Sequence, residues 1–106
     1  KRPGFERKDM DVYSTVMIPF TTAVLGGEAV VQTLTGRVVC KINPGTQSGT
    51  KIRLKGKGIV SMKDAGRCGD QYVTVQIDVP KNLSNEAKRK LKEFEAACKN
   101  GSRGVA

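Results

Sequence analysis

The chain has 106 residues, with 19 Lys and Arg against 10 Asp and Glu, and its formal net charge is +9. It contains no His, which excludes His-based catalytic triads and His metal ligands. Hydrophobic residues make up 38% of the chain. Adding the 12 Gly and leaving out the 2 Tyr gives about 47%, which is typical of a globular domain rather than a disordered tail. No apolar run approaches the roughly 20 residues of a membrane span. The first residue is Lys1, which favours a fragment of a longer protein.

The residues that carry most enzyme chemistry are scattered. The three cysteines are separated by 28 and 30 residues, without a C-x-x-C pair: Cys40, Cys68 and Cys98. We expect reduced thiols that fill space in a reducing, cytoplasmic compartment, and no metal or other cofactor in this chain. Three carboxylates have no partner at a catalytic spacing: Asp64, Asp70 and Asp78. We therefore expect the chain not to be an enzyme.

The composition changes once, near Pro80. Val, Ile and Thr number 25, and 24 of them precede residue 80, whereas Ala, Lys, Glu and Leu dominate afterwards. Because β-branched residues favour sheets, residues 1–80 are expected to form a β domain. Residues 81–106 are expected to form a C-terminal helix and tail.

Alternation of apolar and polar residues between turn residues predicts five strands. They cover Val12–Phe20, Glu28–Leu34, Arg37–Ile42, Thr50–Lys55 and Gln71–Val79. Thr21–Leu25 predicts one helical turn, which a Thr caps and Gly26-Gly27 ends. The apolar face of the last strand includes its final residue, Val79.

The C-terminal helix is predicted to follow Ser84, whose hydroxyl can cap the first turn. Asn100-Gly101 is predicted to end it, and the residues that follow are expected to be mobile. The apolar residues of this helix form one narrow stripe: Leu83, Ala87, Leu91, Phe94 and Cys98. Such a stripe is expected to cover either the sheet of its own chain or a partner.

A basic cluster marks one predicted strand and the turn after it: Lys51, Arg53, Lys55 and Lys57. It is typical either of a stripe that follows nucleic-acid phosphates or of an ordinary solvated sheet face. Aromatic residues are only 5% of the chain, and none lies among these cations in the sequence. We therefore favour the solvated face and expect no nucleic-acid partner.

A series of short motifs resembles one known family. In chain order they are Phe5-Glu6-Arg7, Asp11-Val12-Tyr13, Ala23-Val24-Leu25-Gly26-Gly27, Thr33-Leu34-Thr35-Gly36, Pro44-Gly45-Thr46-Gln47-Ser48-Gly49, Arg53-Leu54-Lys55-Gly56-Lys57-Gly58 and Gly69-Asp70-Gln71-Tyr72-Val73. Their order and spacing resemble the second C-terminal domain of the DnaJ co-chaperones, the 40-kDa heat-shock protein family. The resemblance implies a mainly β, two-layered, sandwich-like domain with one short helical turn and a C-terminal helix.

The resemblance also implies a function. A bacterial, cytoplasmic parent would carry a J-domain that stimulates the ATPase of a 70-kDa heat-shock chaperone. Such a parent can also carry a zinc-binding region; neither is present in this sequence. The domain itself would help to bind unfolded polypeptides and would form a homodimer through its C-terminal end. The alternative is a small basic β-barrel that binds nucleic acid, of ribosomal type.

Residues can be assigned to the two implied roles. We expect the strands Val12–Phe20 and Glu28–Leu34 to line a shallow client groove, because an apolar strand would lie beside one with small side chains. The candidate client contacts are Met17, Ile18, Phe20, Ala29 and Val31. The candidate dimer contacts are the helix stripe: Leu83, Ala87, Leu91, Phe94 and Cys98.

Overall fold

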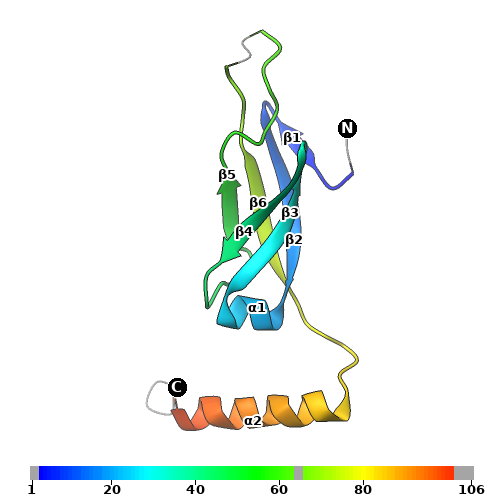
Figure 1. Cartoon of the computed structure of the whole chain (residues 1–106), viewed down its shortest axis with the longest axis vertical. Helices are drawn as coiled ribbons and strands as arrows, with labels where there is room; N and C mark the ends of the chain where they lie inside the picture. The colour runs from blue at the N-terminus through cyan, green and yellow to red at the C-terminus, as the bar shows by residue number, and fades with distance from the viewer. Residues whose placement is uncertain (1–2, 64–65, 102–106) are drawn as a thin grey trace.

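A computed structural model describes residues 3–63 and 66–101. These residues form six strands and two helices (Figure 1). In chain order they are β1 (Glu6–Lys8), β2 (Asp11–Pro19), α1 (Phe20–Leu25), β3 (Gly27–Thr33), β4 (Gly36–Ile42), β5 (Lys51–Leu54), β6 (Gln71–Asp78) and α2 (Asn85–Gly101). The predicted mainly β fold, with a short helix inside and a C-terminal helix, is confirmed.

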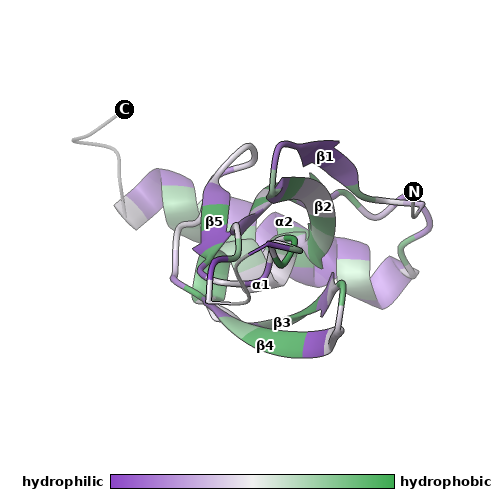
Figure 2. Cartoon of the chain, turned by 90° about the horizontal axis from the view of Figure 1, so that it is seen from above, coloured by the Kyte–Doolittle hydropathy of each residue, from purple (hydrophilic) through white to green (hydrophobic). Residues whose placement is uncertain are grey.

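The strands form two layers. The first sheet has the order β1-β2-β6-β5, and the second is the β3–β4 hairpin. The two central strands of the first sheet, β2 and β6, run parallel, from Val12 opposite Gln71 to Pro19 opposite Asp78. Both outer pairs are antiparallel. Seen along the long axis, the hairpin lies as a separate layer across from the four-stranded sheet (Figure 2).

The core lies between these layers because alternate residues of each strand face inward. Val73 and Val75 of β6 are fully buried, and they pack with Val31 and Ile42 of the hairpin and with Ile18 of β2. Burial of each such side chain contributes about 1.5–3 kcal/mol. The predicted inward positions of Ile18, Val31, Val73 and Val75 are therefore confirmed.

The short helix α1 begins one residue earlier than predicted. Phe20 is its first residue and not the end of a strand, because Pro19 closes β2 and takes the N-cap position. No side chain caps the helix, so the predicted Thr cap is wrong. The predicted end is confirmed: Gly26 has φ of 85° and donates its N–H to Thr22 O at 2.8 Å. A Cβ on Gly26 would lie 2.9 Å from the ring of Pro44.

Two details of the sheet differ from the prediction. Strand β1 was not predicted, because Glu6, Arg7 and Lys8 are all charged and exposed and therefore carry no alternating pattern. Val79 was predicted on the core face, yet it is 71% exposed. Strand β6 ends at Asp78, opposite the last residue of β2, so Val79 lies past the edge of the core.

The long connection from β5 to β6 is held where it leaves the sheet. Gly58 N donates to Gly69 O at 2.9 Å, and Ile59 N donates to Met10 O at 2.7 Å. A Cβ on Gly69 would overlap the Met10 carbonyl oxygen, so this close approach of three segments requires glycine. The predicted carboxylate Asp64 lies outside the described residues.

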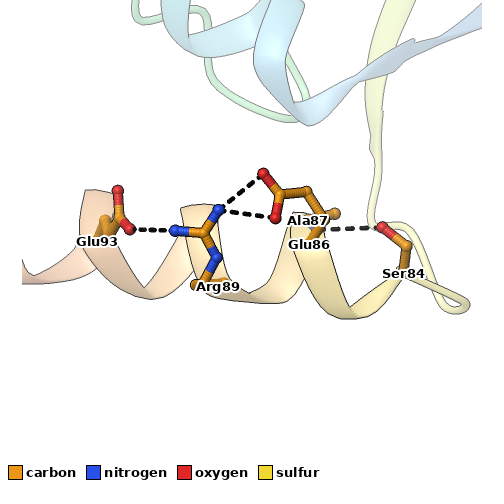
Figure 3. A network of polar contacts seen from close by, with 5 residues as sticks. All are labelled: Ser84, Glu86, Ala87, Arg89 and Glu93. Carbon is orange, nitrogen blue, oxygen red and sulfur yellow. Dashed lines mark hydrogen bonds and ion pairs between the residues drawn. The ribbon is translucent and has the colours of Figure 1, made fainter.

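Helix α2 begins as predicted. Ala87 N donates to Ser84 Oγ at 3.0 Å, and Arg89 forms ion pairs with Glu86 and Glu93 (Figure 3). The helix continues to Gly101, and the tail that was expected to be mobile lies outside the described residues. None of the described side chains of α2 is buried, and the helix lies across the end of the β body, beyond α1 (Figure 1). No helix in the described part is long and apolar enough to cross a membrane.

Candidate functional site

An apolar groove of about 380 Å³ lies between α1 and α2. Its walls come from both helices and from the segment that joins β6 to α2. The lining residues are Phe20, Thr21, Val24, Leu25, Pro80, Leu83, Ala87, Lys90, Leu91 and Phe94. Lys90 is the one charged residue among them, so the groove offers an almost wholly apolar surface.

The side chains on both sides of this groove remain open to solvent. On α1, Val24 is 36% exposed and Leu25 is 75% exposed. On α2, Leu91 is 42% exposed and Phe94 is 44% exposed. Helix α2 therefore does not act as a lid on the sheet of its own chain, which was one of the two expectations from its narrow stripe. Leu91 and Phe94 of its apolar stripe are instead left open to solvent.

The structure brings the predicted dimer contacts together. Leu83, Ala87, Leu91 and Phe94 line the groove. Cys98 lies on a neighbouring hollow of about 470 Å³, which it shares with Leu91 and Phe94. Sequence reasoning missed that α1 forms the opposite wall, because residues 20–25 lie about 60 positions earlier and nothing in the sequence sets the direction of α2.

The predicted client contacts are split between the core and the surface. Ile18, Ala29 and Val31 are 1%, 9% and 2% exposed, whereas Met17 is 59% exposed and Phe20 is 36% exposed. Strands β2 and β3 belong to different sheets, and their apolar faces meet in the core instead of lining an open groove. Only Met17 and Phe20 therefore remain accessible as candidate contacts.

The basic stripe on β5 is tied into a polar network. Arg53 Nε lies 2.7 Å from Asp70 Oδ2, and Gly56 N donates to Asp70 Oδ1 at 2.9 Å. The N–H of Gly56, and then Arg53, hold the pKa of Asp70 below its ordinary value. The hydrogen bond from Arg53 to Asp70 raises the pKa of Arg53. Asp70, which seemed isolated in the sequence, thus anchors the turn after β5.

Aromatic rings lie beside this stripe although none does in the sequence. Arg53 is opposite Tyr72 on β6, and the Tyr72 ring stacks on Tyr13 of β2 with centroids 5.3 Å apart. Glu6 lies opposite Tyr13 on β1, so an acidic residue occupies the other end of the row. The pairing of Tyr13 with Tyr72, which are 59 positions apart, and of Arg53 with Tyr72 creates this row, which is why a linear scan of the sequence missed it.

Cysteines and carboxylates do not gather into a metal centre in the described part of the chain. Cys40 is buried on β4, and its burial raises the pKa of its thiol. Cys68 and Cys98 are exposed.

Two packed sheets, with a short helix inside the chain and a C-terminal helix, define a two-layered, mainly β domain. A sequence profile of the DnaJ C terminal domain matches residues 1–80. The chain belongs to this family.

Bacterial relatives named Chaperone protein DnaJ match most of the chain. One from Lachnospira eligens is 44% identical over 99 residues, which are 93% of this chain and 26% of that protein. One from Caldicellulosiruptor bescii is 44% identical and covers 88% of this chain and 24% of that protein. One from Dichelobacter nodosus is 46% identical over 95% of this chain and 27% of that protein. The chain therefore spans about a quarter of the length of these relatives.

Proposed function

We propose that this chain is the part of a bacterial co-chaperone that binds non-native polypeptide and joins two copies into a dimer. A J-domain outside this chain would pass clients to a 70-kDa heat-shock chaperone and stimulate its ATPase, in the cytoplasm. Membership of the DnaJ C-terminal domain family and the name of its relatives support this role. The chain itself is proposed to need no cofactor and to catalyse no reaction.

The observation that carries the proposal is the uncovered groove between α1 and α2. Leu91 and Phe94 on one wall, and Val24 and Leu25 on the other, each expose a third or more of their surface. Contiguous apolar surface of this kind marks interaction sites in soluble proteins. A two-fold pair that uses the same patch twice is the commonest way to cover it, and so we propose that α2 and α1 of two copies meet here.

Replacement of Leu91 and Phe94 by Ser tests the dimer. We expect the wild-type chain, of 11.4 kDa, to sediment at twice that mass, and the double variant to sediment as a monomer with unchanged strand content in circular dichroism. Ala96→Ser with Lys99→Ser is the matched control, because these residues lie on α2 but line neither hollow. A Leu91→Ser/Phe94→Ser variant that unfolds, or that still sediments as a dimer, refutes the proposed interface.

Exposed apolar side chains also support the proposed client binding. Met17 lies on the outer face of β2, and Phe20 lies at the start of α1. Val30 and Val39 face each other across the β3–β4 hairpin and are 56% and 63% exposed. These side chains are spread over several surfaces of the domain, which suits partners that share apolar character rather than one sequence.

Nucleic-acid binding remains a second candidate because of one structural observation. The stacked pair Tyr13 and Tyr72 beside Arg53, in a chain of net charge +9, has elements of a surface that binds bases and phosphates. Glu6 and Asp70 place negative charge at both ends of this row, which opposes phosphate. We therefore rank this candidate below polypeptide binding.

A further inference from the structure

The outer face of the four-stranded sheet carries a row of side chains that crosses all four strands. Glu6 of β1 lies opposite Tyr13 of β2, which in turn lies opposite Tyr72 of β6. Arg53 of β5 lies opposite Tyr72 on the other side. Directly opposite residues of neighbouring strands project from the same face, and the buried Val73 next to Tyr72 projects from the other. The row therefore consists of a carboxylate, two stacked rings and a guanidinium, and it faces away from the core.

The two ends of this row differ in how their charges are paired. At the β5 end, Arg53 Nε lies 2.7 Å from Asp70 Oδ2, so the guanidinium opposite Tyr72 already has a carboxylate. At the β1 end, Glu6 is exposed and forms no ion pair with the residues that the structure describes. The ring of Tyr13 thus has a carboxylate beside it but no cation. A guanidinium supplied from outside would give this end the same pairing as the other.

A hollow of about 560 Å³ lies at the β1 end of the row. Phe5, Glu6 and Tyr13 line it on one side. Thr15 and Thr74, which lie opposite each other on β2 and β6, line it further along the sheet. The hollow therefore offers two aromatic rings, one carboxylate and two hydroxyl groups. None of the described residues that line it is Lys or Arg.

The charges around this hollow favour a cation as its occupant. Lys8 lies opposite Asp11, and Lys51 lies opposite Thr74 on the β5 side. Neither of these lysines lines the hollow, where Glu6 is the charged residue among those described. The chain carries a net charge of +9, but salt screens this repulsion over distance, whereas the attraction of Glu6 acts at contact. The hollow is therefore complementary to one localised positive charge and not to phosphate.

We propose that this hollow binds the side chain of an arginine on a partner polypeptide. The guanidinium lies on the side of the Tyr13 ring that does not stack on Tyr72, and it donates hydrogen bonds to the carboxylate of Glu6. Arginine is favoured over lysine because its planar head stacks on a ring and meets a carboxylate with two parallel hydrogen bonds. This inference rests on the proposed function and adds to it a site that selects one type of side chain.

Two blocked tripeptides test the selection for positive charge. One is N-acetyl-glycyl-arginyl-glycinamide, and the other carries citrulline in place of arginine, which has nearly the same shape but no charge. Each is titrated into the isotope-labelled whole chain, and the backbone amide shifts are followed by NMR. We expect the arginine peptide to bind about tenfold more tightly, with the largest shifts at Glu6, Tyr13 and Thr15. Equal affinity of the two peptides, or shifts confined to other surfaces, overturns the proposal.

Two substitutions of exposed acidic residues test the role of Glu6. Glu6→Gln removes the charge beside the hollow, and Glu28→Gln is the matched control, because Glu28 is exposed on β3 in the other sheet, opposite Lys41. We expect Glu6→Gln to abolish the preference for the arginine peptide over the citrulline peptide, and Glu28→Gln to keep it. A Glu6→Gln variant that keeps the preference overturns the proposal, and so does an equal loss in both variants.

A second probe separates this inference from the proposed function. The probe is fluorescein-labelled, reduced and carboxymethylated α-lactalbumin, titrated with the whole chain. Failure of the wild-type chain to bind this unfolded protein overturns the proposed function, whatever the tripeptides show. Binding of the unfolded protein by a chain that does not distinguish the two tripeptides overturns the arginine site alone.

Discussion

Cys40 differs from the other two cysteines because it is buried, whereas Cys68 and Cys98 are exposed. The thiol is enclosed between the sheets, and its pKa is raised by that burial, so the reactive thiolate is scarce at neutral pH. We expect an alkylating reagent to modify Cys68 and Cys98 quickly in the folded chain, and Cys40 only after unfolding. Mass spectrometry after partial labelling measures this order, and early modification of Cys40 contradicts the packing.

Asp70 makes the stability of the chain depend on pH. Its pKa is lowered in the folded state, so its stabilising effect is complete above the unfolded value of about 3.9 and is lost as pH falls through the folded pKa. We expect Asp70→Asn to lower the urea midpoint at neutral pH, and this difference from wild type to shrink below about pH 4. A difference that is the same at both pH values contradicts the pairing of Asp70 with Gly56 and Arg53.

The sequence predicts whether a strand residue faces the core more readily than it predicts which distant residues that residue contacts. Alternation placed Ile18 and Val31 inward correctly, and this same orientation removes them from any open client groove. The partners of Asp70 are Arg53 and Gly56, which precede it by 17 and 14 positions, and only the pairing of β5 with β6 brings them together. Contacts of this kind depend on strand register, which the local pattern does not fix.

Among the elements of the fold, the two sheets are connected by the side chain of Gln71. It is fully buried on β6, and its Nε2 donates to Ser14 Oγ at 2.9 Å and to Gln32 O at 3.0 Å. Its Oε1 has no partner within the described part of the chain. One side chain thus links β6 both to its neighbour β2 and to β3 in the opposite layer.

Removal of this link is expected to be costly. Gln71→Ala leaves a cavity and an unpaired carbonyl on Gln32, and we expect it to lower the free energy of unfolding by about 2–4 kcal/mol. Gln76→Ala is the control on the same strand, because Gln76 is exposed, and it should change the value by less than about 0.5 kcal/mol. Urea unfolding of both variants measures the difference, and equal effects would show that Gln71 does not join the layers.

Most elements could be predicted because each has a local cause. Gly26 ends α1 and Ser84 begins α2, and both effects act over a few residues. Strand β1 has no such signal, since its three charged residues are held only by pairing with β2. The parallel pairing of β2 with β6 joins residues about 60 positions apart, and alternation within each strand says nothing about its neighbour.

At the scale of the whole molecule, the chain has a β body at one end and a helix with no buried residue at the other. The body has a core of its own, whereas α2 packs closely against none of the described elements. The apolar stripe of α2 was visible in the sequence, but the groove that it forms with α1 was not. This arrangement places the proposed dimer contact at the end of the molecule opposite the connection between β5 and β6 (Figure 1).

The most direct test of polypeptide binding compares two ligands at two salt concentrations. The whole chain is titrated with the labelled unfolded α-lactalbumin and, separately, with a labelled single-stranded oligonucleotide, at about 50 mM and about 200 mM salt. We predict that the unfolded polypeptide binds with affinity that changes little with salt, because apolar and main-chain contacts are not screened, and that it binds more tightly than the oligonucleotide at the higher salt. Tighter binding of the oligonucleotide, with affinity that falls steeply with salt, would contradict polypeptide binding and favour the basic nucleic-acid-binding alternative.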